Sequence, residues 1–331
     1  MGTVALFLGA FVLAIAALSK FYMYDQLAVV PLNQDTTSEA TTAPGADAEY
    51  LDAAAGLKVT NGPLKNVKVV RGDIEASKQA SKDLGKDIAV WDIYDSTDKP
   101  TFDFASGETA LSATDDRVAF DRHTGLAVDW KGTKSTADGE TIEPGDFTGL
   151  YFKFPFGAEK KTYPFWDGTL RQATPAKYVG EGTVKGMKVY KYRQTIEPIK
   201  TGTIDVPGTL VGSDEGTVTA DRIYSSVSDY SIDPVTGVVL FGQTAQDSYL
   251  ELDGERVLTT TKATLAYTDA NVAKTVDDFK SKSSLLGALQ TTVPIGGLVL
   301  GVVLIGVGAF ARRSRPAAAH TAGKDELVGS R

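Results

Sequence analysis

One stretch of this sequence gathers aromatic side chains, and it is the strongest candidate for a binding site. Seven aromatic residues fall within the 16 positions from Tyr151 to Trp166. Pro155 and Pro164 interrupt the stretch, so it is not expected to form one central strand. The rings could line an apolar ligand cavity, or they could fill a core where chain segments cross.

The cavity interpretation assigns ligand contacts to a defined set of rings. They are Phe152, Phe154, Phe156, Tyr163, Phe165 and Trp166. The charged residues between them, at 159–161, are expected at a loop tip. A lipid is the matching ligand class, because moving an acyl chain from water into an apolar cavity is favourable by about 0.8 kcal/mol per methylene.

The residue types needed for catalysis are scarce. The chain has no Cys and two His, which excludes thiolate nucleophiles, iron–sulfur clusters and Cys-type zinc sites. His123 falls in a turn pattern, and the adjacent carboxylates Asp115 and Asp116 are expected to be turn and edge charges before a strand. We therefore expect no enzymatic activity, no cofactor and no bound metal.

The overall charge argues against a nucleic-acid partner. Asp and Glu number 42 against 34 Lys and Arg, which gives a net charge of −8, whereas nucleic-acid-binding surfaces are basic. Residues 73–86 predict a helix whose Lys78, Lys82 and Lys86 share one face. That stripe is expected to be a solvated face rather than a ligand-recognition face.

An uncharged run at the N-terminus predicts the first element that positions these residues. Val4–Leu18 carries no charge, and from Met1 it covers 18 residues, which span about 27 Å as a helix. Residues 14–16 resemble a signal-peptide cleavage site. No basic segment precedes the run, however, and aromatic residues typical of a membrane interface follow at 21–24. We therefore expect an uncleaved membrane anchor.

A second uncharged run lies near the C-terminus. Val293–Ala311 has 19 residues without a charge, and Arg312, Arg313 and Arg315 follow it. Basic residues beside a membrane helix mark its cytoplasmic end, so the sequence predicts a two-pass plasma-membrane protein with both termini cytoplasmic. Its parts are a transmembrane helix at 1–24, an extracytoplasmic β-rich domain at 25–284, a transmembrane helix at 285–311 and a cytoplasmic tail at 312–331.

Glycines in the second run suggest helix pairing. Gly297 and Gly301 form a GxxxG pair, and small residues of this kind let helices approach closely in lipid. Gly9 is the expected facing residue in the first run. The alternative is that these glycines only reflect the general frequency of Gly in membrane helices.

Between the two runs the sequence is typical of a β protein. Stretches rich in Val, Ile, Thr and Tyr recur between turn signals, most clearly at Val67–Val70, Ile88–Tyr94 and Lys188–Arg193. Residues 35–47 are expected to be a linker or a loose strand, and residues 269–281 a helix. The predicted fold is mostly β, a large antiparallel β-barrel-like ectodomain with a few short helices, flanked by the N- and C-terminal transmembrane helices.

One turn pattern, apolar-Asp-x-x-Thr-Gly-apolar, occurs twice. It covers Phe120–Val128 and Ile232–Leu240. Asp accepts hydrogen bonds from the backbone two residues on, and Gly adopts positive φ. Each segment therefore predicts a β-turn with a glycine bulge between two strands, and Asp253-Gly254 predicts a further hairpin.

Several of these segments together resemble an actinobacterial envelope family known as porin PorA. The resemblance covers nearly the whole chain, and the block Phe154-Pro155-Phe156-Gly157-x-Glu159-Lys160-Lys161-x-Tyr163 makes it specific. That family has no established active site, so no catalytic residue is implied. More distantly, the two-anchor layout and residues 178–192 resemble the class B scavenger receptor and lysosomal integral membrane protein family, which implies a lipid tunnel through the ectodomain.

Three functions are open at this point. The leading hypothesis is a membrane-anchored envelope protein that binds or conducts a lipid or another apolar envelope component through its ectodomain. The second is a structural or assembly protein whose ectodomain has a solid core. The third is an oligomeric porin-like channel built from the helices, because an outer-membrane barrel would span with amphipathic strands rather than with apolar helices.

Overall fold

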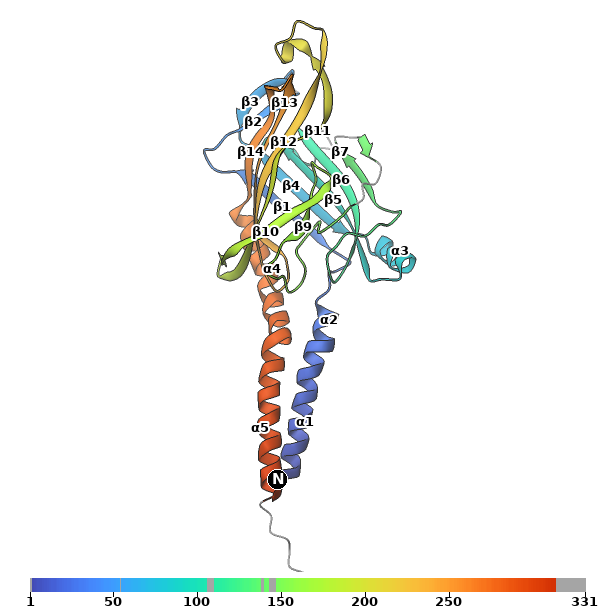
Figure 1. Cartoon of the computed structure of the whole chain (residues 1–331), viewed down its shortest axis with the longest axis vertical. Coiled ribbons are helices and arrows are strands. Elements are labelled where there is room, and N and C mark those ends of the chain that lie inside the picture. Colours follow the sequence, from blue (N-terminus) through green and yellow to red (C-terminus); the bar gives the residue numbers. More distant parts are fainter. Residues whose placement is uncertain (1, 54, 106–109, 138–139, 143–146, 314–331) are drawn as a thin grey trace, which may run out of the picture. The chain divides into compact units, whose positions relative to one another are not determined.

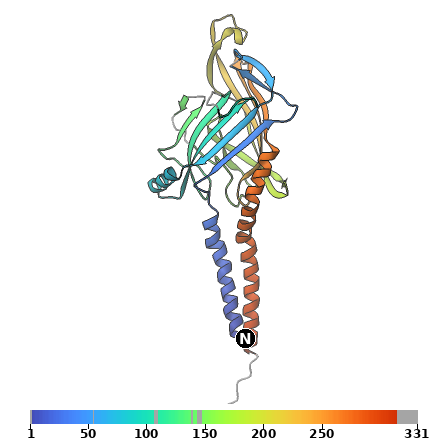
Figure 2. The same cartoon turned by 180° about the vertical axis from the view of Figure 1, so that it is seen from behind.

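The computed structural model describes residues 2–53, 55–105, 110–137, 140–142 and 147–313. The chain divides into two compact units. The helical unit lies within Met1–Leu27 and Gly287–Arg331, and the β unit is Ala28–Leu286. Figure 1 labels the elements, and Figure 2 shows them from behind.

The helical unit consists of apolar helices. Its elements are α1 (Gly2–Leu18), the π-helical turn η1 (Ser19–Met23), α2 (Tyr24–Leu27), the π-helical turn η3 (Ala288–Thr292) and α5 (Val293–Arg313). By length and composition, the helices Gly2–Leu27 and Asp269–Arg313 can each cross a membrane. Large apolar side chains such as Phe7, Phe11 and Val299 remain exposed on them, which suits contact with lipid.

Small residues hold α1 and α5 close together. A Cβ placed on Gly9 would lie 2.8 Å from the carbonyl oxygen of Gly301, and one on Gly297 would lie 2.7 Å from the Cβ of Ala16. Gly2, Gly9 and Ala16 are buried on α1, and their even spacing matches the seven-residue period of left-handed helix pairing. The two backbones are therefore closer than larger residues would allow.

The β unit is built from one 14-stranded sheet and two α-helices in the part of the chain that the structure describes. The first strands are β1 (Asp35–Thr42), β2 (Ala48–Asp52), β3 (Lys58–Gly62), β4 (Lys65–Gly72), β5 (Ile88–Asp98), β6 (Ser112–Asp121), β7 (Lys134–Ala137) and β8 (Glu140–Ile142). The later strands are β9 (Tyr163–Asp167), β10 (Gln172–Val184), β11 (Met187–Pro207), β12 (Thr217–Ile232), β13 (Val239–Leu252) and β14 (Glu255–Tyr267). The helices are α3 (Ile74–Leu84), α4 (Asp269–Gly287) and the 3₁₀ turn η2 (Gly208–Leu210).

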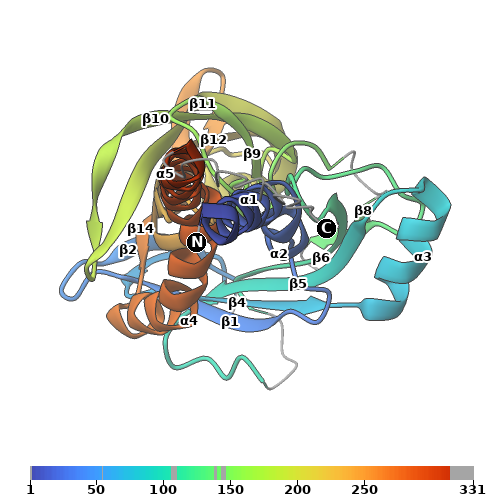
Figure 3. The ribbon, with the colours of Figure 1, turned by 90° about the horizontal axis from the view of Figure 1, so that it is seen from below.

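The sheet curls on itself as an antiparallel half-barrel. Its strand order is β8-β7-β6-β5-β4-β1-β14-β13-β12-β11-β10-β9, with β2 added between β14 and β3. Figure 3 shows β10, β11 and β12 facing β1 and β4 across the interior. At one end, isolated bridges join β6 to β9 in steps: Phe120 to Ala127, Leu126 to Leu150, and Leu150 to Phe165. The predicted mostly-β, barrel-like fold is confirmed.

The two Thr-Gly segments form the predicted turns. Asp121 accepts hydrogen bonds at Oδ1 from the backbone N–H groups of His123 and Thr124, and Gly125 has φ 77°. In the second turn Gly237 has φ 74°, and a Cβ there would lie 1.9 Å from the carbonyl oxygen of Phe154. His123 is thus a turn residue, as expected from the sequence.

The segment 35–47 was expected to be a linker or a loose strand, and most of it is a central strand. Asp35–Thr42 forms β1, which pairs with β4 on one side and with β14 on the other. Its polar residues do not oppose this, because its β-branched threonines suit strand geometry and the inner face of the sheet is itself polar at this point.

Of the predicted basic stripe, Lys78 and Lys82 lie on α3, whereas Lys86 lies beyond the end of the helix. Asp73 caps this helix by accepting a hydrogen bond at Oδ1 from the Ala76 N–H, and Gly85 ends it in the left-handed conformation. Lys78 pairs with Glu75 on the helix surface, and both side chains are more than half exposed. The exposure of Lys78 agrees with the expectation that this face of the helix contacts solvent.

Candidate functional site

The strand register identifies which side chains point into the half-barrel. Val70 on β4 lies opposite Ile93 on β5, and both belong to one buried apolar cluster. Side chains alternate along a strand, so residues two positions away point the same way. Lys68 and Asp95, which also lie opposite each other, therefore share the inner face.

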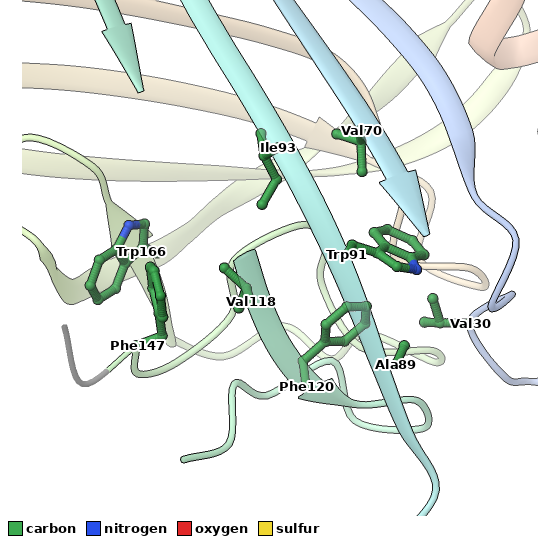
Figure 4. Packing of buried hydrophobic residues seen from close by; sticks show 9 residues of the cluster. All are labelled: Val30, Val70, Ala89, Trp91, Ile93, Val118, Phe120, Phe147 and Trp166. Carbon is green, nitrogen blue, oxygen red and sulfur yellow. The ribbon is translucent and has the colours of Figure 1, made fainter. Parts of the chain in front are cut away.

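An aromatic layer, here called the aromatic floor, closes one end of the interior. Its rings come from β5, β6, β9, β11 and the segment 147–156, and they are Trp91, Phe120, Phe147, Tyr151, Phe152, Phe154, Phe156, Tyr163, Phe165, Trp166 and Tyr192. Figure 4 shows part of it, with Phe147 beside Trp166 and Phe120 near Trp91. The ring centroids of Trp91 and Phe120 are 5.0 Å apart, and those of Phe154 and Tyr192 are 4.5 Å apart. Val30 packs into the same layer, so the floor lies where the chain enters the β unit.

The six rings predicted to contact a ligand all lie in the aromatic floor. Four of them, Phe154, Tyr163, Phe165 and Trp166, are no more than 8% exposed. Phe152 and Phe156 are half-buried at its margin. The structure thus brings the predicted residues together, and it packs them mainly against each other. A ligand contact for these rings stays a prediction.

A lysine lies within the aromatic floor, and the sequence reasoning overlooked it. Lys153 is 8% exposed, and its Nζ has no hydrogen-bond partner. The ammonium lies 3.7 Å from the centre of the Phe156 ring. Burial lowers the pKa of Lys153 to about 7, and the nearby Asp233 carboxylate opposes that shift. The sequence did offer one sign of this burial, because Lys153 stands between Phe152 and Phe154 within the aromatic block.

Above the floor, the inner face is polar. Lys68 Nζ lies 2.9 Å from Asp95 Oδ2, and the two side chains keep 41% and 28% of their surface exposed. Asn66 donates a 2.6 Å hydrogen bond to Asp95 Oδ1. An ion pair that points into the barrel and keeps part of its surface exposed is compatible with a hydrated interior, because dry burial of such a pair is costly. The Asp95 carboxylate raises the pKa of Lys68, so the ammonium stays charged.

Two tyrosines share the inner face with this ion pair. Tyr230 on β12 lies opposite Gly242 on β13, and the ring of Tyr267 on β14 covers Gly242 from the other side, with ring carbons 3.5–3.7 Å from the position of a Cβ. Burial raises the pKa of Tyr230 and of Tyr267. Both hydroxyls therefore remain protonated at neutral pH and can donate hydrogen bonds.

Hydrogen bonds tie the polar inner face to the floor. Tyr230 donates to Gln194 Oε1 at 2.9 Å. Gln194 in turn donates through Nε2 to the carbonyl oxygen of Phe165 at 2.8 Å and to Thr174 Oγ1 at 2.7 Å. Gln194 is only 1% exposed, so these bonds satisfy a buried amide.

The carboxylates Asp115 and Asp116 take opposite faces of β6. Asp115 lies outside and approaches Lys134 at 3.5 Å, as an edge charge would. Asp116 is 5% exposed and accepts hydrogen bonds from the hydroxyls of Ser135 and Tyr151 at 2.5 and 2.6 Å. The expectation of an edge charge was therefore wrong for Asp116, because strand alternation turns it inward.

The outer face of the half-barrel carries charged pairs. Arg193–Asp229, Lys200–Asp221 and Arg256–Asp247 approach within 2.7–2.8 Å and keep 30–53% of their side-chain surface exposed. A barrel that spans a bilayer with its strands needs an apolar outer band. In the described residues, the features suited to lipid lie on the helices rather than on these strands.

A hollow of about 670 Å³ lies among β11, β12, β13, β14 and the β1–β2 segment. Its lining mixes apolar side chains such as Ile196 and Val227 with polar ones, among them Thr42, Glu49, Thr195, Ser226, Gln246 and Lys262. Within the described ranges, no group of three or more His, Asp or Glu side chains could hold a metal ion.

Sequence comparisons agree with the resemblance noted above. The family described as Porin PorA matches this chain over residues 1–310. A protein named Porin PorA from Corynebacterium amycolatum is 26% identical over 298 residues, covering 73% of this chain and 75% of that protein. Another Porin PorA, from Corynebacterium resistens, is 27% identical over 255 residues, covering 67% of this chain and 60% of that protein.

Proposed function

Since the chain belongs to the porin PorA family, we propose that it is a membrane-anchored, porin-like protein of the cell envelope that admits small polar solutes to its inner face. The observation that carries this proposal is the solvent-exposed Lys68–Asp95 ion pair inside the half-barrel. An aqueous interior lined by polar groups is what a path for hydrophilic solutes requires.

The proposal includes the topology expected from the sequence. The helical segments at 1–24 and 285–311 would cross the plasma membrane, with both termini cytoplasmic and the β unit outside. A reporter fused after Arg331 should be cytoplasmic, and one inserted after Gly212, in a surface turn, should be extracytoplasmic. A cytoplasmic reporter at Gly212 would contradict the topology.

Solute entry can be tested with the full-length protein in liposomes. Swelling assays with small polar solutes should show faster entry than protein-free liposomes. The double variant Lys68→Met/Asp95→Asn should change that rate. The matched control is Lys200→Met/Asp221→Asn, which alters an outer Lys–Asp pair at 2.7 Å and should leave the rate unchanged.

Two outcomes of this assay point elsewhere. If no solute enters faster than in protein-free liposomes, the porin-like proposal fails. If entry occurs but neither double variant alters it, the route runs through an assembly of the helices, which is the oligomeric channel considered from the sequence.

Binding of a lipid or another apolar component remains a second proposal. It is favoured by Phe152 and Phe156, which stay half-buried at the margin of the aromatic floor. The full-length protein in detergent should then bind a fluorescent fatty acid, and Phe152→Ala should weaken that binding. Equal fluorescence with and without protein would end this proposal.

A further inference from the structure

We propose that the polar inner face recognises neutral, polyhydroxylated solutes of the carbohydrate class, at a site centred on Lys68, Asp95 and Tyr267. This inference rests on the proposed polar-solute role, and it narrows the class of solute that the interior would hold.

The charge balance of the site points to a neutral ligand. Lys68 and Asp95 face each other at 2.9 Å, so the site presents one positive and one negative charge side by side. An anion or a cation would have to compete with the partner already in place. A neutral solute can instead bridge both groups, because an ammonium offers three donors and a carboxylate offers several acceptor positions.

The hydrogen-bonding groups around the pair match a ligand that both donates and accepts. Hydroxyl and amide side chains occupy neighbouring inner-face positions on β1, β4, β12 and β13. They are Thr36, Ser38, Asn66, Ser228 and Thr244. Each of these groups can act as donor and as acceptor. Neighbouring hydroxyls of a sugar have the same dual capacity, whereas carboxylates only accept and ammonium groups only donate.

The two tyrosine rings supply an apolar surface of the right kind. Tyr230 and Tyr267 flank Gly242 on the inner face, and the Tyr267 ring packs over Gly242, with ring carbons 3.5–3.7 Å from the position of a Cβ. In the described part of the chain, no hydrogen-bond partner is seen for the Tyr267 hydroxyl. A sugar ring presents C–H groups on its faces and hydroxyls around its rim, so it can lie on the electron-rich face of a tyrosine while the rim meets polar groups.

The aromatic floor gives this site a closed base. The rings of Phe165 and Tyr230 have centroids 4.8 Å apart, so the tyrosine is held from below by the floor. Gln194 fixes its hydroxyl from the side. A ring held in this way loses little conformational entropy when a ligand binds.

The test is binding of three probes of different charge to the full-length protein in detergent micelles by isothermal titration calorimetry. The probes are maltotriose, which is neutral and polyhydroxylated, the anion succinate and the cation putrescine. We expect saturable binding of maltotriose with an affinity about tenfold or more above that of the two charged probes, a difference of about 1.4 kcal/mol. Equal affinities, or preference for a charged probe, would overturn the inference.

Matched variants locate the binding. Tyr267→Ala should weaken maltotriose binding about tenfold, and Tyr267→Phe, which keeps the ring, should weaken it less. The control is Tyr249→Ala, which removes a ring that packs on Arg256 instead. If Tyr249→Ala matters as much as Tyr267→Ala, the site is not on the inner face. Circular dichroism checks that each variant is folded, and Tyr267→Phe keeps the test valid if the alanine variant unfolds.

The swelling assay separates this inference from the proposed function. If polar solutes enter liposomes and maltotriose shows no preferential binding, the carbohydrate inference fails and the porin-like proposal stands. If no solute enters and maltotriose still binds through Tyr267, the inner face is a carbohydrate-binding surface and the porin-like proposal fails.

Discussion

The aromatic floor and the polar inner face lie on the same strands, only two residues apart. On β4 the inward side chain changes from Val70 to Lys68, and on β5 it changes from Ile93 to Asp95. The strand period decides which face a residue takes, but it does not decide whether that face is wet or dry. Position along the strand does that, since rings pack against the inward side chains at one level and a partly exposed ion pair lies two residues further on.

The two regions are also stabilised differently. The floor gains free energy from burying large rings, so it is sensitive to lost volume. The polar inner face depends on paired charges and hydrogen bonds in contact with water, each of which contributes little net free energy. Substitutions in the floor should therefore change stability, and substitutions in the polar face should change solute binding.

The largest effect is expected in the centre of the floor. Phe154 is fully buried, so Phe154→Ala should lower the free energy of unfolding by about 3–5 kcal/mol. Tyr94→Ala removes a ring that is 39% exposed and serves as the control. Thermal unfolding of the full-length protein in detergent gives the measurement. Similar melting temperatures for the two variants would mean that Phe154 lies at the wall of a void or ligand site.

The second effect concerns the turn that packs on the floor. Gly237 and Gly254 both have positive φ, at 74° and 82°, so an alanine at either costs about 1–3 kcal/mol in backbone strain. Only at Gly237 would the new Cβ also meet backbone, at 1.9 Å from the Phe154 carbonyl oxygen. Gly237→Ala should therefore destabilise the protein more than Gly254→Ala in the same melting assay. Equal losses of stability for the two variants would show that the turn at Gly237 does not pack closely against the floor.

The third prediction uses the lysine inside the floor. The pKa of Lys153 is about 7 in the folded protein and about 10.4 in an unfolded chain. Between these values the unfolded state binds more protons, so folding stability should rise as the pH rises from about 7 to about 10. Below pH 7 both states are protonated and the full penalty of burying the charge applies.

Lys153→Met should relieve that penalty. Replacing an unpartnered buried charge with an apolar residue of similar length should stabilise the protein by about 1–3 kcal/mol at pH 6. The gain should shrink as the pH approaches 10. Lys177→Met changes an exposed lysine, so it should neither stabilise the protein at pH 6 nor alter how stability depends on pH. Chemical unfolding at several pH values measures how the free energy of unfolding of each variant depends on pH. A pH-independent effect of Lys153→Met would refute the buried-charge explanation.

The smallest change in stability is expected in the polar inner face. Lys68→Met should lower the free energy of unfolding by about 1 kcal/mol or less, because the pair is partly exposed and screened. The outer variant Lys200→Met should behave alike in melting experiments. The two should differ in solute entry, where only Lys68→Met has an effect. A large loss of stability for Lys68→Met, without one for Lys200→Met, would show that the Lys68–Asp95 ion pair is buried and stabilises the fold.

The sequence predicted the general fold because the strand and turn signals are local. Thr-Gly turns, the Asp253-Gly254 hairpin and the β-branched stretches depend on nearest neighbours, and the structure has all of them. The aromatic block was also found, because its composition alone marks it. What the block packs against depends on residues far away in the chain, such as Trp91 and Tyr192.

The polar inner face could not be predicted for a physical reason. In the segment 67–70, alternation suggests that Val67 and Val69 point to the core and that Lys68 points to water. In the structure Lys68 and Val70 point inward, while Val67 is buried on the opposite face, so alternation alone does not tell the inner face from the outer one. Asp116 was misread in the same way, and the polar strand β1 looked like a linker because neither of its faces is apolar.

Closure of the sheet by Leu150 has a consequence for how copies of this protein can associate. β9 would otherwise be a free edge strand, open to pairing with a strand of another molecule. The N–H of Leu150 donates to the Pro164 carbonyl at 2.8 Å, and the Leu150 carbonyl accepts from the Trp166 N–H at 2.8 Å. Pro164 itself has no N–H to offer. Strand-to-strand polymerisation at this edge is thereby blocked, so a multimer of the chain must form through other surfaces.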